Sequence, residues 1–285
     1  MGKGDRFEVL VQEEILWRHK SSVDWVKWGD LNTKYFHART IRRRKRNHIV
    51  ALKNSQGEWV EDQSTLSQMA RQYYIVLFTD EDLQTSPMSH GFTPMQVPQW
   101  EKLGEEYTVE ELKSAVSMMG PLKAPGRDGL NPLLYQHFWD VVAPAVHEFA
   151  SNCWVEPPRI RDVNETILVL IPKVRRPSRF EQFRPISLCN VAYKIITKCL
   201  AERLKSFMPD LVHETQTSFV PGRHITDNIC VLQEVVHSMR AKTGRSEWMV
   251  IKVDLAKAYH RIRWNFVRDT LEAAGMPDKF IELTM

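Results

Sequence analysis

The amino-acid sequence predicts a helix-rich α+β protein. Two stretches, 131–153 and 191–207, carry apolar residues at helical spacing and are long enough to form amphipathic helices. Short apolar or β-branched runs of strand length occur at 166–171 and 250–253. Of the 285 residues, 43% are apolar, which is enough to build a core in one large domain or in two ordinary ones.

The first 79 residues predict a basic extension that contains helices and one hairpin. A polar stretch ending in Gly57 favours a turn between two short strands. The expected elements, in order, are a helix over 7–22, a helix from Asn32 or Thr33 to about Arg46, strands over 49–53 and 58–61 joined by the turn 54–57, and a helix over 62–78.

The second of these helices ends in five consecutive cations, which are Arg42, Arg43, Arg44, Lys45 and Arg46. From Leu31 to Gly57 the chain has eight Lys and Arg residues and no Asp or Glu. Like charges on one helix repel, so the run costs stability unless an anion is bound. Nucleic-acid phosphate would supply that anion. Solvated surface charge and a nuclear-import signal are the alternatives that the residues leave open.

Residues 80–106 are predicted to form a linker, because the periodic spacing of apolar residues disappears there and proline, serine and threonine become frequent. The sequence therefore predicts three parts: the extension over 1–79, the linker, and a domain over 107–285.

The domain is expected to begin with helices. Thr108 and Glu111 form a capping box that begins a helix to Met119. A long helix follows from Asn131 to about Cys153, with proline at its first position. A further helix is expected over 191–207, with its isoleucines and leucines inside and Arg203 among the cations outside.

Two cations flank the strand-like runs in the middle of the chain. Thr166 to Ile171 is a continuous apolar run that predicts a strand buried on both faces. Lys173 follows it, and Arg184 lies in the returning run Phe183–Leu188. Two strands that present Lys173 and Arg184 from one edge would form a cationic clamp for a triphosphate. Independent surface cations are the alternative.

Asp254 lies where a predicted strand turns into a helix-friendly stretch. Val250 to Val253 is expected to be a buried strand, and a carboxylate at its end would be held rigidly over a cleft. Such a carboxylate suits Mg²⁺. An Asp in this place can also act only as the N-cap of the next helix. Tyr259 is five residues further on and could reach over the same cleft.

These segments together resemble the reverse transcriptases of LINE-type (non-LTR) retrotransposons, most closely those of plants. The resemblance rests on W-x-x-x-G-D-x-N-T-K-Y-F-H from Trp25, A-P-G-x-D-G at 124–129, L-I-P-K and F-R-P-I-S-L around Lys173 and Arg184, Q-x-x-F-x-P-G-R at 216–223, and V-D-x-x-K-A-aromatic at 253–259. It implies a partial right-hand polymerase, with the fingers and the start of the palm, preceded by the basic extension.

The resemblance also implies an RNA-directed DNA polymerase that uses an RNA template, a DNA primer and deoxynucleoside triphosphates. It assigns Asp254 as a catalytic, metal-binding residue with the Leu255 carbonyl, Lys173, Arg184 and Tyr259 to the nucleotide, and Gln216, Gly222 and Arg223 to nucleic acid. The chain departs from the family at Arg127, where proline is usual, and at His260, where aspartate is usual.

The chain lacks part of the catalytic set that the resemblance implies. The family holds two cations, Mg²⁺ or Mn²⁺, with a second carboxylate source in an aromatic-x-Asp-Asp motif, and this sequence contains no Asp-Asp pair. We therefore expect metal binding only with a complete palm, and no activity from this chain alone. The other hypotheses are a non-catalytic RNA- or DNA-binding module that uses the basic helix 39–46, and an inactive relic.

Cysteine usage and hydropathy exclude other classes. The four cysteines form no C-x-x-C pair and no zinc-finger spacing. No apolar run approaches the roughly 20 residues of a membrane span, so we expect no membrane partner. Together with the resemblance, the basic run leads us to expect an intracellular, nuclear protein.

Overall fold

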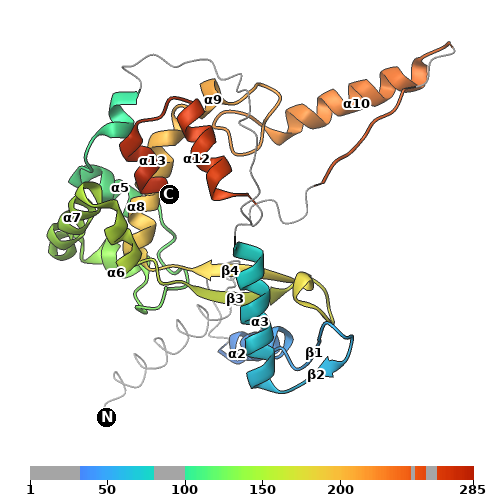
Figure 1. Ribbon diagram of the computed structural model, residues 1–285, viewed down its shortest axis with the longest axis horizontal. Helices are drawn as coiled ribbons and strands as arrows, with labels where there is room; N and C mark the ends of the chain where they lie inside the picture. Colours follow the sequence, from blue (N-terminus) through green and yellow to red (C-terminus); the bar gives the residue numbers. More distant parts are fainter. Residues whose placement is uncertain (1–32, 80–99, 245–247, 255–261) are drawn as a thin grey trace. The chain divides into compact units, whose positions relative to one another are not determined.

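The computed structural model describes residues 33–79, 100–244, 248–254 and 262–285 (Figure 1). The helix expected over 7–22, most of the expected linker, and Leu255, Tyr259 and His260 lie outside the described residues. The backbone contacts divide the chain into two compact units. We call residues 1–76 with 166–188 the hairpin unit, and residues 77–165 with 189–285 the helical unit.

The hairpin unit holds two antiparallel two-stranded sheets and two helices. Its elements are α2 (Thr33–Asn47), β1 (Leu52–Lys53), β2 (Trp59–Val60), α3 (Gln63–Phe78, of which the last two residues belong to the helical unit), β3 (Ile167–Pro172), the 3-10 turn η3 (Phe180–Gln182) and β4 (Phe183–Leu188).

The predicted turn between β1 and β2 is confirmed. The backbone N–H of Asn54 donates to the Glu58 carbonyl over 2.9 Å, and Gly57 has a φ of +87°, which favours glycine. The Asn54 side chain also accepts from the N–H groups of Gln56 and Glu58, which fixes the turn.

The β3–β4 hairpin is less buried than the sequence predicts. The strands pair from Ile167 opposite Leu188 to Pro172 opposite Phe183. Ile167 and Ile186 are each 43% exposed, so the prediction of a strand buried on both faces is wrong. Among the residues that the structure describes, β3 pairs with β4 alone, and a two-stranded ladder cannot cover both faces of a strand.

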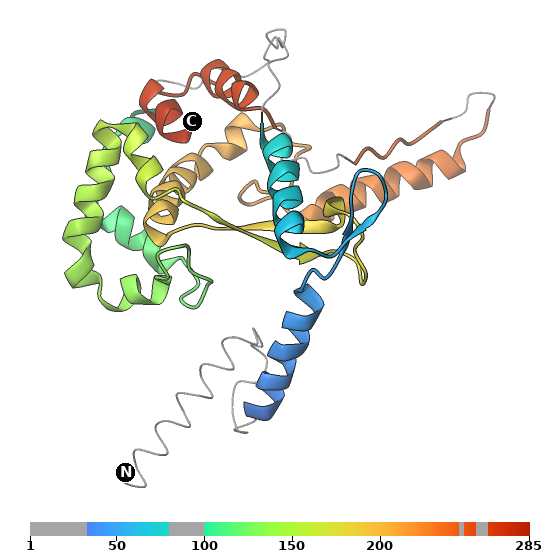
Figure 2. The ribbon, with the colours of Figure 1, turned by 60° about the horizontal axis from the view of Figure 1, so that its bottom comes forward.

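One small hydrophobic cluster holds the hairpin unit together. Its buried members are Leu52, Leu66, Phe180 and Phe183. Helix α3 crosses the β3–β4 hairpin in both ribbon views, and its Tyr73 stacks on Phe180 with ring centroids 5.4 Å apart (Figures 1 and 2). The sequence-based division assigns the two hairpins to different parts, whereas here they share a core.

The helical unit contains most of the remaining described elements. They are η1 (Lys102–Gly104), α5 (Val109–Ser117), α6 (Pro132–His137), α7 (Trp139–Val155), η2 (Pro157–Asp162), α8 (Val191–Lys205), α9 (Met208–Leu211), α10 (Ile225–Ala241), α12 (Trp264–Ala273) and α13 (Asp278–Thr284).

Local capping explains where these helices begin. The Thr108 hydroxyl accepts from the Glu111 N–H over 3.2 Å at the start of α5, and the Asn131 side chain accepts from Leu134 at the start of α6. The single helix expected from Asn131 to Cys153 is two helices, α6 and α7, that meet at Phe138. Hydrogen bonds continue through this residue, since its N–H donates to Leu134 and its carbonyl accepts from Val142, so the junction is a kink.

The apolar segment before Asp254 is not a buried strand. Residues 248–254 have no regular secondary structure, and Met249, Ile251 and Val253 are 79%, 68% and 75% exposed. A strand needs a partner for its backbone groups, and no described strand pairs with this segment. Helix α10 likewise buries none of its residues.

Candidate nucleotide and nucleic-acid sites

The five predicted nucleic-acid cations are exposed on α2. Arg44, Lys45 and Arg46 occupy its last turn. Cations at the C-terminal end of a helix interact favourably with the helix dipole, which offsets part of their mutual repulsion. Phe36, on the first turns of the same helix, is 1% exposed and fixes α2 in place. Helix α2 also lies against β3 within the hairpin unit. Binding of nucleic acid by this run stays a prediction.

The structure brings Lys173 and Arg184 to the same end of the β3–β4 hairpin. Arg184 pairs with Ile171, and the Lys173 N–H donates to the Gln182 carbonyl over 2.8 Å. The two cations are thus diagonal neighbours in the ladder, and diagonal neighbours share one face. Both side chains are exposed. The Lys173 ammonium donates to the Glu181 carbonyl over 3.3 Å, which holds it beside the hairpin end. Binding of a triphosphate by this pair stays a prediction.

Arg223 has a role that the sequence did not predict. Its Nη1 donates to the carbonyls of His213 and Gln216 over 2.6 and 2.8 Å, and its Nη2 to those of Pro209 and Val212 over 2.8 and 2.9 Å. Four of its five N–H groups are therefore used to close the loop over 209–223.

The same loop presents an aromatic side chain to solvent. Phe219 is 85% exposed and has a φ of +66°, a left-handed conformation that costs energy for a residue with a Cβ. Its neighbours Thr217 and Val220 are buried, and Gly222 has a φ of +76°. Arg223 thus organises a loop that carries Gln216, Phe219 and Gly222, while contact of these residues with nucleic acid stays a prediction.

Asp254 lies at the exposed end of the 248–254 segment. Tyr259 and Leu255, its expected partners, lie outside the described residues. No group of three or more His, Cys, Asp or Glu side chains at metal-binding distance occurs in the described ranges. One carboxylate and one carbonyl cannot hold two divalent cations, so the donor set described here does not fit the two-metal centre.

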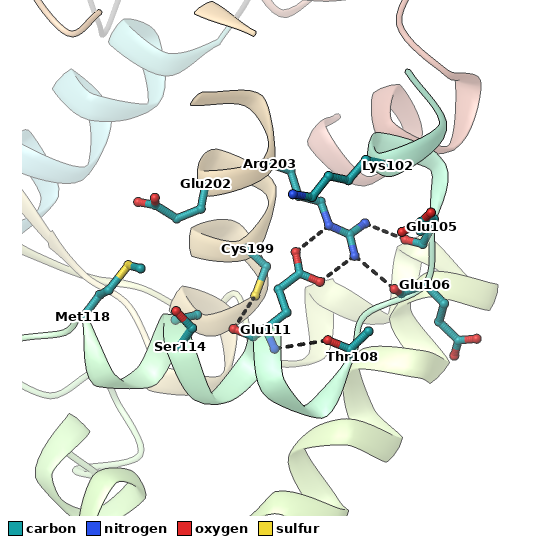
Figure 3. A pocket seen from close by; sticks show the side chains of 11 residues that line it. Lys102, Glu105, Glu106, Thr108, Glu111, Ser114, Met118, Cys199, Glu202 and Arg203 are labelled. Carbon is teal, nitrogen blue, oxygen red and sulfur yellow. Dashed lines mark hydrogen bonds and ion pairs between the residues drawn. The ribbon is translucent and has the colours of Figure 1, made fainter. Parts of the chain in front are cut away.

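The helical unit contains a buried ion pair that the sequence did not lead us to predict. Arg203 is 4% exposed, and its Nε and Nη2 donate to the two carboxylate oxygens of Glu111, each over 2.6 Å (Figure 3). The guanidinium also donates to the carbonyls of Glu105 and Glu106 and lies 4.9 Å from the ring centroid of Tyr107. Burial opposes the charge of Arg203, but the hydrogen bonds and charge of Glu111 outweigh it and raise its pKa.

The prediction that Arg203 points outward is therefore wrong. Helical spacing contained the signal, because Ile196, Leu200, Arg203 and Phe207 form one stripe at intervals of three or four residues. The other three members of the stripe are buried. An arginine on an apolar stripe needs an acidic partner, and Glu111 on α5 supplies it.

A pocket of about 320 Å³ lies beside this pair. Figure 3 shows the side chains that line it, among them Lys102, Glu105, Glu202 and Cys199. Burial raises the pKa of Cys199 to about 12, so its thiol is neutral, and it donates to the Glu111 carbonyl. The polar groups that line the pocket most deeply already bind one another, which indicates a structural junction between α5 and α8.

Comparison with known proteins connects these residues to one family. Residues 171–285 match the family described as reverse transcriptase (RNA-dependent DNA polymerase). This part of the chain is similar to reverse transcriptases. It begins at Ile171 and therefore includes Lys173, Arg184, Arg223 and Asp254.

Three relatives extend the likeness beyond residues 171–285. A Xenopus laevis protein described as "Transposon TX1 uncharacterized 149 kDa protein" is 28% identical over 255 residues, which are 88% of this chain and 19% of that protein. A retrovirus-related Pol polyprotein from a type-1 retrotransposable element R2 of Bradysia coprophila is 26% identical over 186 residues, 65% of this chain and 20% of that protein. The Pol polyprotein from the type-2 element R2DM of Drosophila melanogaster is 26% identical over 200 residues, which are 70% of this chain and 18% of that protein.

The chain thus spans about a fifth of the length of these relatives. The matched residues 171–285 are thus similar to the reverse transcriptase family, and two of the relatives are Pol polyproteins of retrotransposable elements. These residues draw on both units, because the end of β3 and β4 belong to the hairpin unit and α8 to α13 to the helical unit. No described helix combines the length and the apolar character that crossing a membrane requires.

Proposed function

We propose that this chain is the segment before the fingers, the fingers and the first part of the palm of a LINE-type reverse transcriptase. Its plant-like motifs support that lineage of RNA-directed DNA polymerases. The observation that carries the proposal is the family match over residues 171–285, which contains the motifs F-R-P-I-S-L, Q-x-x-F-x-P-G-R and V-D-x-x-K-A and all but the first residue of L-I-P-K. The diagonal placement of Lys173 and Arg184 at one hairpin end supports the proposal independently.

Each predicted site residue has a defined task in this proposal. Lys173 and Arg184 neutralise the phosphates of an incoming deoxynucleoside triphosphate, and Tyr259 supports its sugar. Within a complete palm, Asp254 and the Leu255 carbonyl would hold a Mg²⁺ or Mn²⁺ ion, which would polarise a phosphoryl oxygen. The loop of Gln216, Gly222 and Arg223 faces the RNA template and the DNA primer.

The chain alone is an incomplete catalyst in this proposal. It has one aspartate of the metal set, and its 248–254 segment has no described strand partner. We expect no primer extension from the purified chain with an RNA template, a DNA primer, deoxynucleoside triphosphates and either Mg²⁺ or Mn²⁺. The Asp254→Asn variant is the matched control. Extension by the wild-type chain that disappears in this variant would contradict the incompleteness and would support the metal role.

A test of the clamp does not require turnover. Deoxynucleoside triphosphate binding by the chain should weaken roughly tenfold in Lys173→Gln and in Arg184→Gln, since each removes one charge-assisted phosphate contact. The control is Lys194→Gln, which removes a cation from the helical unit. Equal weakening in all three variants would show that only net charge matters.

A second function is favoured by the distribution of charge. The described residues of the hairpin unit carry fourteen Lys and Arg against four Asp and Glu, a net charge of +10. A non-catalytic RNA- or DNA-binding module of this kind retains its binding in Asp254→Asn and loses it as salt rises. The same basic run supports our proposal of a nuclear location, which microscopy of the tagged chain with and without Arg42–Arg46 replaced by alanine would test.

A further inference from the structure

We propose that the loop joining β3 to β4, residues 173–182, binds single-stranded nucleic acid together with Trp59 of the β1–β2 hairpin. A base stacks on Trp59, and the loop arginines Arg175, Arg176 and Arg179 bind the neighbouring phosphates. The class of ligand rests on the proposed function. The residues are new, because neither the sequence motifs nor the family match assigns a role to any of these four.

The loop is fixed against the N-terminal hairpin. The Lys53 N–H of β1 donates to the Ser178 carbonyl over 2.8 Å, so Ser178 occupies the outer edge of β1. The Ser178 N–H donates to the Gln182 side chain over 2.6 Å. Phe180 anchors the same loop in the hydrophobic cluster. The loop is thus a built element of the hairpin unit.

This anchoring brings the loop arginines close to β1. Arg179 follows Ser178 directly and Arg176 precedes it by two residues, and consecutive Cα atoms are about 3.8 Å apart. Their side chains therefore begin within one or two residues of the hydrogen bond to Lys53. All three loop arginines are exposed, whereas Pro177 and Ser178 between them are partly buried.

Trp59 supplies an aromatic surface beside these cations. It pairs with Lys53 in the β1–β2 ladder and is 58% exposed. The Lys53 ammonium lies 5.3 Å from the centroid of the indole ring, a cation–π contact that orients the ring. An exposed, oriented indole among cations is the arrangement that stacks unpaired bases.

Two of the four acidic side chains among the described residues of the hairpin unit are engaged in local hydrogen bonds, and the other two, Glu61 and Glu181, are exposed. The Glu58 carboxylate accepts from the Asn54 side chain within the turn. Asp62 accepts from the Ser64 and Thr65 hydroxyls and from the Thr65 N–H at the start of α3. Among the described residues, Arg175, Arg176 and Arg179 make no ion pair. Their charges therefore face solvent and would be neutralised by a polyanion.

The ligand is a single strand because a base can stack on a protein ring only when it is unpaired. RNA and DNA single strands both offer unpaired bases and phosphates. The test therefore compares a uridine-rich RNA 20-mer, the DNA strand of the same sequence, and the duplex of that DNA strand.

The first experiment measures binding of the full chain to these three probes by fluorescence anisotropy over a range of salt. Trp59→Ala should weaken single-strand binding roughly 5- to 100-fold, with Trp59→Phe close to wild type and duplex binding unchanged. Replacing Arg175, Arg176 and Arg179 by glutamine should reduce the slope of log K against log salt by about 2 for RNA. The matched control replaces Arg161, Arg240 and Arg268 of the helical unit, which are equally exposed, and should leave the slope unchanged.

A second experiment uses the unmodified protein, so that a misfolded variant cannot decide the outcome. Single-stranded RNA that contains 5-iodouridine is bound to the protein, and the complex is irradiated. The protein is then digested, and the cross-linked peptides are mapped. The proposal predicts a cross-link in the peptide that contains Trp59. Bound RNA with cross-links only outside 53–59 and 173–182 would overturn it.

The outcomes separate this inference from the proposed function. If replacing Arg42–Arg46 removes binding while the Trp59 and loop variants bind as wild type, the inference fails and nucleic-acid binding stands. If Trp59→Ala weakens duplex and single strand equally, stacking is wrong. If the folded wild-type chain binds none of the three probes, both the inference and nucleic-acid binding by this chain fail.

Discussion

The hairpin unit and the helical unit differ in how charge is related to structure. The described residues of the hairpin unit have a net charge of +10, whereas those of the helical unit carry seventeen Lys and Arg against twenty-one Asp and Glu, a net charge of −4. The buried cluster of the hairpin unit has four residues, and that of the helical unit has twenty-one. The chain as a whole has a net charge of only +4, so its total charge conceals this difference between the two units.

The comparison teaches that stability and binding are assigned to different parts of the chain. In the helical unit the central arginine, Arg203, is buried and paired with Glu111. In the hairpin unit the arginines of α2 and of the 173–182 loop are exposed, and turns and a small core hold the backbone that carries them. An excess of exposed cations over acidic groups on a small scaffold favours binding of a polyanion over stability.

The largest effect is expected from the arginine of the helical unit. Arg203→Ala leaves the Glu111 carboxylate without its partner in a largely buried place, and should lower the free energy of unfolding by about 3–5 kcal/mol. Urea denaturation followed by circular dichroism measures this change. The control Lys198→Ala, which removes a partly exposed pair with Glu202, should cost only about 0.5 kcal/mol. Similar values for the two variants would contradict a structural role for Arg203.

Phe183 should stabilise the hairpin unit by a comparable amount, and its removal should affect that unit alone. Phe183 is 1% exposed in a cluster of four, and Phe183→Ala should cost about 3–5 kcal/mol through reduced burial and a cavity. Hydrogen exchange should increase in β1, β3 and β4 and stay unchanged in α5 and α8. A uniform increase across the whole chain would show that the two units do not unfold separately.

A smaller effect is expected from the N-cap of α3. Hydrogen bonds from Ser64 and Thr65 lower the pKa of Asp62 from 3.8 to about 2. A carboxyl with a lowered pKa stabilises the folded state above pH 3.8, and this contribution disappears as the pH falls through 2. The protection factors for hydrogen exchange in the first turn of α3 should therefore fall over this pH window in the wild type and stay constant in Asp62→Asn. Equal pH dependence in both would exclude this group as the cause.

The smallest effect on stability is expected in the apolar segment before Asp254. Ile251 is 68% exposed, so Ile251→Ser should change the free energy of unfolding by less than about 0.5 kcal/mol. The same variant should raise solubility, because an exposed apolar run favours association. Light scattering and urea denaturation measure the two quantities. A decrease of several kcal/mol would show that the segment is buried in solution.

Local sequence signals predicted much of the fold. The turn at Asn54–Gly57 and the N-caps at Thr108 and Asn131 rest on short-range hydrogen bonds, which a sequence specifies directly. Burial was harder to predict, because it depends on partners elsewhere in the chain. The runs at 166–171 and 250–253 have the composition of buried strands, yet no described neighbours cover both faces of the first or pair with the second.

The residues of the candidate sites were likewise predictable only where local structure fixes their positions. The order of Lys173 and Arg184 around a hairpin was predictable, because antiparallel strands fix which residues face one another. The four carbonyls to which Arg223 donates were not predictable, because they belong to a loop with no sequence periodicity. Pairing of Arg203 with Glu111 joins residues ninety-two positions apart, and only the helical stripe around Arg203 indicated its burial.

The most direct test of the contrast between the units is salt-dependent binding of the full chain to fluorescent single-stranded RNA. The variant to compare with wild type has Arg42, Arg43, Arg44, Lys45 and Arg46 replaced by alanine. We predict tight binding by the wild type that weakens steeply with salt. The slope of log K against log salt should fall by up to about 3.5 in the variant, or about 0.7 for each phosphate that its side chains no longer neutralise. Identical slopes for the two folded proteins would contradict nucleic-acid binding by the cations of α2, and no binding by the wild type would contradict the assignment of nucleic-acid binding to the hairpin unit.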